Sequence, residues 1–159
     1  MRAEDLSAVN LAKSGQLGDI NFFRYFLSIG NLAKTQIPTA IYEAYEFAKE
    51  LGADQEIYAS ANNDESVILV TGKNAAGYII NMFFDFSNPS TTPIKQVEIA
   101  GTKVIYQFDT ASEKAFWSDF LASENDFVFE EAGDKELNFF EKVKASYLEN
   151  KLVDLGGEI

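Results

Sequence analysis

The chain has 159 residues, of which 47% are hydrophobic and 24% charged, so it has the size and composition of one soluble globular domain. Asp and Glu (25) outnumber Lys and Arg (13), and the net charge of -12 argues against nucleic acid and anionic membranes as partners. The sequence contains no His and no Cys, which excludes His- or Cys-dependent catalytic triads, disulfides and Cys-ligated zinc within this chain. No apolar run approaches the roughly 20 residues of a membrane span, and no basic-then-apolar leader opens the sequence, so we expect a cytoplasmic protein.

The first third of the sequence predicts two helices and one strand. Residues 3–14 carry apolar side chains at three- and four-residue spacing, which predicts a helix followed by a turn over residues 14–19. Residues 20–29 (INFFRYFLSI) are apolar at both sets of alternating positions, which is typical of a strand covered on both faces. The clearest helix runs over residues 38–51, with Pro38 in its first turn.

The remainder predicts a sheet and a last helix. Short breaks of turn-type residues separate five expected strands, which favours antiparallel hairpins in a meander over 56–62, 66–71, 75–86, 94–100 and 102–108. Residues 110–129 contain a helical turn around Phe116 and Trp117, and Asp134 is the expected N-cap of a helix over 134–153. This order predicts an α+β fold in a single domain over residues 1–159: an open, mostly antiparallel β-sheet with helices packed on one face.

The sequence predicts no catalytic, cofactor-binding or metal-binding residue within the chain. Glu43, Glu46 and Glu50 share the polar face of the helix over 38–51, and we interpret them as a solvated face. No glycine-rich phosphate-binding loop or calcium-binding loop occurs. Gly15 and Gly18 lie between an expected helix and an expected strand, the reverse of the order in a dinucleotide-binding turn.

The strands carry more aromatic residues than one layer of helices is expected to cover. We interpret most of these residues as core and expect the rest to form a second apolar sheet face. Such a face usually marks an interface, so we predict a homo-oligomer through the sheet. The residues concerned are Phe22, Phe23, Tyr25, Phe26, Tyr78, Phe83, Phe84 and Phe86.

Several segments, in order and spacing, resemble the C-terminal domain of the glucose–fructose oxidoreductase/inositol dehydrogenase (Gfo/Idh/MocA) family. Residues 11–20 (LAKSGQLGDI) resemble the S-G-x-[IL]-G-x-[IV] turn that opens this domain. Residues 42–59, ending in GADQEIYA, resemble the helix and strand that follow, and residues 97–106 (VEIAGTKVIY) resemble a later hairpin. Residues 138–140 resemble part of the terminal helix, so that the resemblance extends over residues 5–150.

The resemblance implies a substrate-binding and oligomerisation domain that is inactive in isolation. In this family a separate N-terminal Rossmann domain binds NAD or NADP and supplies a catalytic Lys for hydride transfer at a sugar or polyol carbon. The family's D-x-x-x-H signature would fall at Pro38 and Tyr42, which replace the Asp and the His. By the same resemblance, the candidate substrate-binding residues are Tyr42, Lys34, Arg24 and Tyr45, which we expect near the start of the second helix.

Two other classes of protein remain open from the residues alone. A non-catalytic α+β ligand-binding or dimerisation module, similar to cystatin-like or nuclear-transport-factor-like folds, would use the same aromatic residues as a pocket or dimer face. A G-x-G-x-x-G strand–turn–helix encoded upstream of Met1 would favour the dehydrogenase over the module. A carboxylate-based hydrolase is the third class, although no carboxylate pair lies among apolar residues that would raise one pKa.

Overall fold

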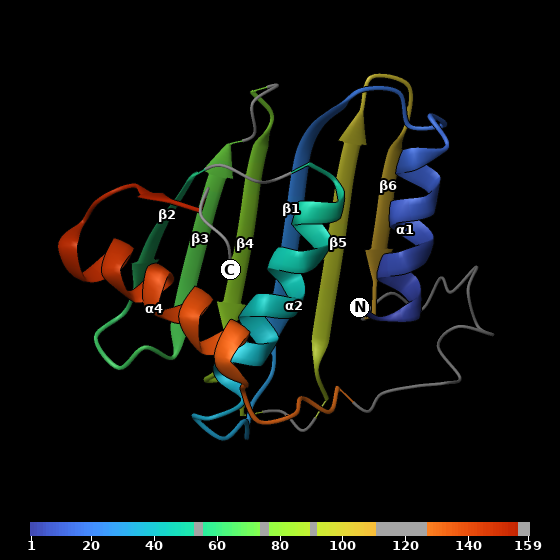
Figure 1. Ribbon diagram of the computed structural model, residues 1–159. Helices are drawn as coiled ribbons and strands as arrows, with labels where there is room; N and C mark the ends of the chain where they lie inside the picture. The colour runs from blue at the N-terminus through green and yellow to red at the C-terminus, as the bar shows by residue number, and fades with distance from the viewer. Residues whose placement is uncertain (53–55, 74–76, 90–91, 111–126, 156–159) are drawn as a thin grey trace.

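Three helices and seven strands make up the described part of the molecule, a computed structural model covering residues 1–52, 56–73, 77–89, 92–110 and 127–155 (Figure 1). The helices are α1 (Ala3–Lys13), α2 (Ile37–Glu50) and α4 (Asp134–Glu149). The strands are β1 (Ile20–Ser28), β2 (Glu56–Ala61), β3 (Val67–Lys73), β4 (Ile79–Asp85), β5 (Ile94–Gly101), β6 (Ile105–Asp109) and β7 (Val153–Asp154). None of the helices in this described part is long and apolar enough to cross a membrane.

Local chemistry accounts for the ends of the helices. Pro38 lies in the first turn of α2, where its missing N–H has no intrahelical partner to lose. Helix α4 ends at Glu149, and the next residue, Asn150, adopts the left-handed conformation (φ 52°) that Asn tolerates well. The helix predicted over 134–153 is therefore shorter than expected, and the last residue of the predicted range, Val153, lies in the short strand β7 instead.

The seven strands form one sheet in the order β6-β5-β1-β4-β3-β2-β7. All neighbouring pairs are antiparallel except β1 and β4, which run parallel in the centre. The α+β fold with a mostly antiparallel open sheet is confirmed. The simple meander is wrong, because β5 does not pair with β4: β1 lies between them and separates them.

The physical reason for this correction lies in β1. Its side chains are apolar at both sets of alternating positions, which suits a central strand, but nothing in its own sequence specifies which strands pair with it. The crossover through α2 and the β2–β3 hairpin brings β4 to one side of β1, and β5 returns to the other. Of the helical turn predicted in 110–129, residues 111–126 lie outside the described residues.

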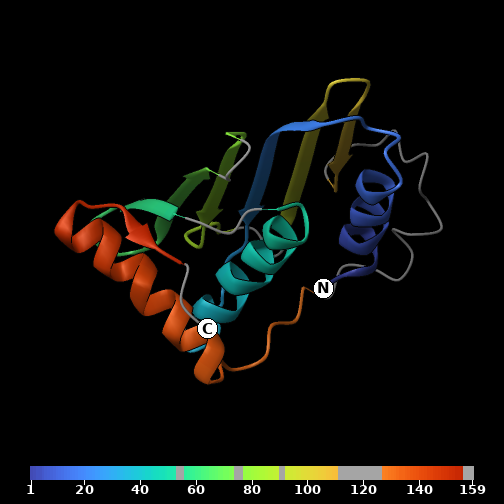
Figure 2. The ribbon, with the colours of Figure 1, turned by 45° about the horizontal axis from the view of Figure 1, so that its top comes forward.

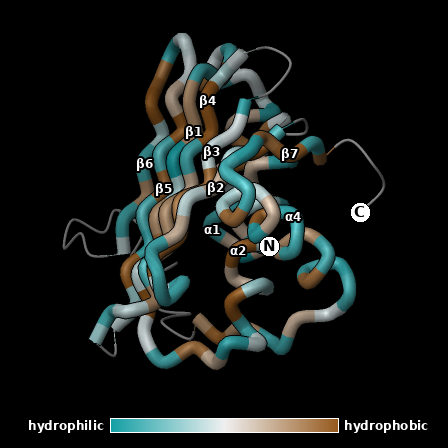
Figure 3. The backbone as a smooth tube through the Cα atoms, turned by 90° about the vertical axis from the view of Figure 1, so that its left-hand side faces the viewer, coloured by the Kyte–Doolittle hydropathy of each residue, from teal (hydrophilic) through white to brown (hydrophobic). Residues whose placement is uncertain are grey.

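All three helices lie on the same face of the sheet, as expected (Figures 2 and 3). We call this the inner face. Phe23 and Tyr25 of β1 project from it and are 0% and 1% exposed. Phe47 of α2 packs edge-on against both rings, with centroid distances of 5.0 Å and 6.5 Å. The core therefore lies between the sheet and the helices and leaves the opposite, outer face without a helix in the described part of the chain.

Candidate functional site

Aromatic and aliphatic side chains gather on the outer face of the sheet. Phe26 of β1 and Phe83 of β4 are register partners, and their rings stack with centroids 5.6 Å apart and planes inclined by 7°. In another row across the same strands, Phe22 lies beside Ile79, which is 52% exposed. Large apolar side chains grouped on one uncovered surface are typical of an interface.

A polar row crosses the outer face between these apolar rows. The strand register places Arg24 of β1 between Glu98 of β5 and Asn81 of β4. Gln107 of β6 continues the row and donates a hydrogen bond from Nε2 to Glu98 Oε2 at 2.9 Å. The guanidinium of Arg24, an exposed residue, lies 5.4 Å from the centroid of the Phe22 ring. The row thus sets one cation beside a carboxylate and an amide, next to the stacked rings of Phe26 and Phe83.

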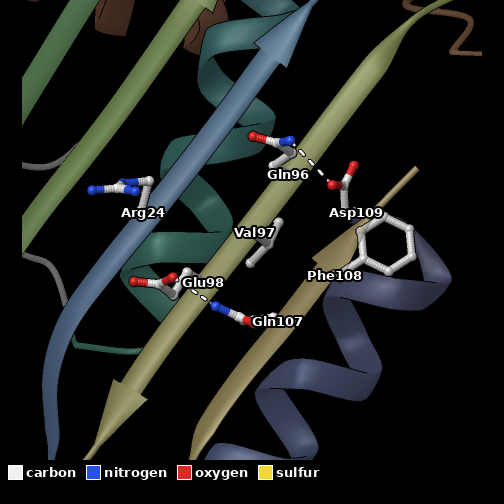
Figure 4. Close-up of a pocket in the computed structure, with 7 residues that line it drawn as sticks. All are labelled: Arg24, Gln96, Val97, Glu98, Gln107, Phe108 and Asp109. Atoms are coloured by element: carbon white, nitrogen blue, oxygen red, sulfur yellow. Dashed lines mark hydrogen bonds between the residues drawn. The ribbon is translucent and has the colours of Figure 1, made fainter. Parts of the chain in front are cut away.

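A shallow depression of about 230 Å³ lies over β1, β5 and β6 on this face (Figure 4). Gln96 donates from Nε2 to Asp109 Oδ2 at 3.1 Å, and the Gln107–Glu98 bond lies alongside. Arg24 extends away from β5 in this view. No group of three or more potential metal-ligating residues occurs in the part of the chain that the structure describes. The lining residues are Arg24, Gln96, Val97, Glu98, Gln107, Phe108 and Asp109.

Tyr42 and Tyr45, two of the predicted substrate-binding residues, lie together in the contact between α2 and α4. The Tyr45 ring stacks on Phe139 of α4 with centroids 4.2 Å apart, and the Tyr42 ring lies 5.7 Å from the same ring. They are 8% and 3% exposed respectively. Burial raises the pKa of Tyr42, and the carboxylates of Glu46 and Glu136 raise it further. Tyr42 therefore remains protonated at neutral pH and can donate a hydrogen bond but cannot act as a base.

The other two predicted residues lie elsewhere. Lys34 is exposed in the connection between β1 and α2. Arg24 projects from the outer face of β1, on the opposite side of the sheet from α2. The expectation that all four residues lie near the start of the second helix is therefore wrong for Arg24. Its alternation with the buried Phe23 and Tyr25 could have placed it on the other face.

The connection that carries Lys34 is fixed by hydrogen bonds on the helix side. Gln36 accepts a bond from the Ala33 backbone N–H at 2.9 Å and donates one to the Phe129 carbonyl at 2.7 Å. The Ala132 N–H donates to the Thr35 carbonyl at 3.0 Å. The start of α2 is thus tied to the segment that leads into α4.

A polar cluster marks the adjacent ends of β1 and β4, which coincide because the two strands run parallel. Ser28 donates to Asp85 Oδ2 at 3.3 Å and accepts from Asn88 Nδ2 at 2.9 Å. Ser87 donates to Asp85 from both its hydroxyl and its backbone N–H. Carboxyl ends of parallel strands are a common place for ligands, so this end of the sheet and Lys34 form the second candidate region.

Two features were not predicted from the sequence: the polar cluster and a buried cation, Lys95. A sequence signal existed for Lys95, because it occupies the same alternating set of β5 as Val97 and Ile99, which are both buried. The pairing of Ser28 with Asp85 had no such signal, since it depends on the parallel register of two strands that are distant in sequence.

No protein-family model and no curated protein sequence matches the chain. Solved structures do share its fold. A probable dehydrogenase from Thermotoga maritima superposes with a TM-score of 0.67 at 14% identity, over 96% of this chain and 62% of that one. A scyllo-inositol dehydrogenase from Lactobacillus casei, solved with NAD(H) and scyllo-inositol, gives 0.68 at 13% identity. A myo-inositol dehydrogenase from Corynebacterium glutamicum gives 0.68 at 11% identity, and each of these two matches covers 98% of this chain and 62% of the other.

The connection between β1 and α2 does not fit a nicotinamide dinucleotide. This connection is the strand-to-helix turn that follows β1, the first strand of the parallel pair, but its residues 30–36 contain a single glycine rather than a glycine-rich motif. Pro38 removes one of the free N–H groups at the start of α2, and the Gln36 side chain accepts from the Ala33 amide. A pyrophosphate would therefore find few backbone donors here.

Proposed function

We propose that this chain is the substrate-side and oligomerisation domain of an NAD(P)-dependent sugar or polyol dehydrogenase of the Gfo/Idh/MocA type. The observation that carries the proposal is the fold match: almost all of this chain superposes on only 62% of two inositol dehydrogenases. The rest of such an enzyme, an N-terminal Rossmann domain, would bind NAD or NADP. The chain alone would then be inactive, in keeping with the poor fit of its own turns to a dinucleotide.

The outer face supports the oligomerisation part of the proposal. It presents Phe26, Phe83 and Ile79 without a covering helix in the described residues. A second copy of the chain is the partner we propose for this surface. Arg24 then serves the interface rather than the substrate, because it lies in the polar row of the same face.

The helix side supports the substrate part. Lys34 is exposed in the connection that follows the carboxyl end of β1, and its ammonium could bind a substrate oxygen there. Tyr42 lies on α2, which begins directly after this connection, and its hydroxyl, which bonds to Glu46, would have to leave Glu46 to donate to a substrate. Tyr45 holds α2 against α4 through its stack on Phe139 and would position this end of the helix.

Sedimentation velocity tests the interface. The chain should self-associate, and Phe83→Glu should make it monomeric because a carboxylate would be buried opposite Phe26. Leu148→Glu, the same kind of change at a 72% exposed residue of α4, is the matched control and should leave association intact. A strictly monomeric parent chain, or an associating Phe83→Glu variant, would refute the proposed interface.

Calorimetry tests the missing nucleotide site. Titration of the chain with NADH and NADPH should give no saturable heat, because the phosphate-binding turn would belong to the other domain. Saturable binding of either nucleotide would refute the proposal that the nucleotide site lies in the other domain. Adding the Rossmann domain of the same enzyme should confer nucleotide binding and activity. In that complex, Lys34→Ala should raise KM more than it lowers kcat.

The non-catalytic module is the second candidate, favoured by one observation: the outer face presents apolar side chains with no helix over them in the described residues, and a dimerisation module would use the same surface. Both candidates predict self-association in sedimentation velocity. They differ in what they require besides this chain: the dehydrogenase needs a Rossmann domain in the same protein or in a partner, and the module does not.

A further inference from the structure

Arg24 places an exposed cation in the middle of the outer face, on β1. It forms no ion pair with a carboxylate of the described residues, although Glu98 lies beside it in the register of β1 and β5. Its side chain extends away from β5 (Figure 4), and its guanidinium lies 5.4 Å from the centroid of the Phe22 ring instead. Glu98 accepts a hydrogen bond from the neutral amide of Gln107. A guanidinium and a carboxylate thus lie side by side without neutralising each other.

A partner that covers this face has to neutralise both groups. An ionised side chain that is taken out of water without an opposite charge is strongly unfavourable. The partner must therefore bring a carboxylate to Arg24 and a cation to Glu98. A second copy of the chain carries both groups, on the same face and on neighbouring strands. Two copies repel each other at long range because each has a net charge of -12, so opposite charges at the place of contact matter more.

Two-fold symmetry determines how the two copies meet. In a two-fold dimer the contacts are reciprocal, so an Arg24 that meets Glu98 of the second copy implies that its own Glu98 meets the other Arg24. Two sheets that pack face to face about an axis between β1 and β5, parallel to the strands, satisfy this condition. The strand order then places β1 over β5 of the second copy and β4 over its β6.

Apolar residues on the same four strands fit this arrangement. Phe22 of β1 shares its row with Ala100 of β5, so a large side chain of one copy would lie over a small one of the other. Ile79 of β4 and Ile105 of β6 continue that row on either side and would meet across the axis. They are 52% and 57% exposed, so both would lose contact with water.

Other positions of the axis leave the charges unbalanced. An axis along the polar row opposes Arg24 to Arg24 of the second copy, which brings like charges together. An axis between β1 and β4 gives Arg24 only the amide of Asn81. It also places Glu98 over Thr71 of β3, so both charges are covered without an opposite one. The charges therefore favour the axis between β1 and β5.

We propose that two copies of the chain pack through their outer faces and are held in register by two reciprocal ion pairs, each between Arg24 of one copy and Glu98 of the other. This inference rests on the proposed oligomerisation role and adds to it the symmetry and the residues that determine it. Arg24 is then a specificity residue: an apolar surface without a carboxylate at this place would leave its charge buried and unpaired.

Charge reversal and mixing, followed by sedimentation velocity, test the ion pairs. Arg24→Glu alone and Glu98→Arg alone should each raise the dimer Kd by about 100-fold, because a dimer loses two ion pairs at roughly tenfold each. An equimolar mixture of the two variants should associate within about fivefold of the parent Kd, because both contacts between unlike copies then join opposite charges. Lys73→Glu, the same reversal at an exposed residue of β3 outside the contacting strands, is the control and should leave Kd unchanged.

The mixture distinguishes a contact between copies from a contact within one copy. If Arg24 paired with Glu98 of its own chain, the double variant Arg24→Glu/Glu98→Arg would recover but the mixture would not, and the proposal would be wrong. The neutral substitutions Arg24→Gln and Glu98→Gln are a milder second pair in case a reversal disturbs the fold, and each should raise Kd by about tenfold or more.

The remaining outcomes separate this inference from the function on which it rests. A parent chain that stays monomeric refutes the outer face as an interface between copies, and the ion pairs with it. A parent chain that dimerises through Phe83, but whose Kd is unchanged by the substitutions at Arg24 and Glu98, refutes the ion pairs and leaves the interface in place.

Discussion

The two faces of the sheet are built from the same strands but obey different rules. On the inner face, Phe23, Tyr25 and Phe84 are at most 1% exposed and interlock with a helix layer. On the outer face, Phe26 and Phe83 stack on each other while remaining partly exposed. Aromatic content alone therefore does not identify a core. In this sheet, alternate residues of one strand pack into the core on one face and form a surface available for contact on the other.

The largest expected effect tests this division directly. Phe47→Ala removes a fully buried ring from the inner face and should lower the free energy of unfolding by about 3–5 kcal/mol. Phe83→Ala, the matched change on the outer face, should cost less than about 1.5 kcal/mol in the monomer because the ring is already partly in water. Urea denaturation at low protein concentration measures both. Equal losses would mean that the two faces do not differ in this way.

A smaller effect is expected at the edge of the sheet. The Ser146 hydroxyl of α4 accepts from the Ala59 N–H of β2 at 2.8 Å and donates to the Lys151 carbonyl at 2.6 Å. Ser146→Ala leaves that buried N–H without its partner and should cost about 1–3 kcal/mol in urea denaturation. Ser60→Ala, on the exposed side of the same strand, is the control and should stay within about 0.5 kcal/mol of the parent chain. A harmless Ser146→Ala would show that the helix layer does not complete this edge.

The helices and strands, and the two faces of each strand, could be predicted from the sequence because both depend on the local periodicity of apolar residues. The helix over 38–51 and the alternation in β1 and β4 are such features. Strand order could not be predicted in the same way, since the parallel pairing of β1 with β4 depends on competition among all strands. For the candidate site the limit is similar: Tyr42 and Tyr45 were found together on α2, but their stack with Phe139 needed the position of α4.

The last prediction concerns Tyr106 of β6, which lies near α1 at the edge of the inner face. Tyr106→Phe should leave the free energy of unfolding near neutral pH unchanged. Burial raises the pKa of Tyr106 to about 12, and the nearby carboxylates of Asp5 and Glu4 add to the effect. A raised phenol pKa means that the folded protein resists ionisation, so the stabilisation is complete below the ordinary pKa of 10.0 and is lost as pH rises toward about 12. Ultraviolet titration of the phenolate should therefore lose one late-titrating group in Tyr106→Phe, and this variant should resist alkaline unfolding better than the parent chain. If the group lost in Tyr106→Phe titrated instead at the ordinary pKa of 10.0, α1 would leave the Tyr106 hydroxyl open to water, and the inner face would not exclude solvent as far as this strand.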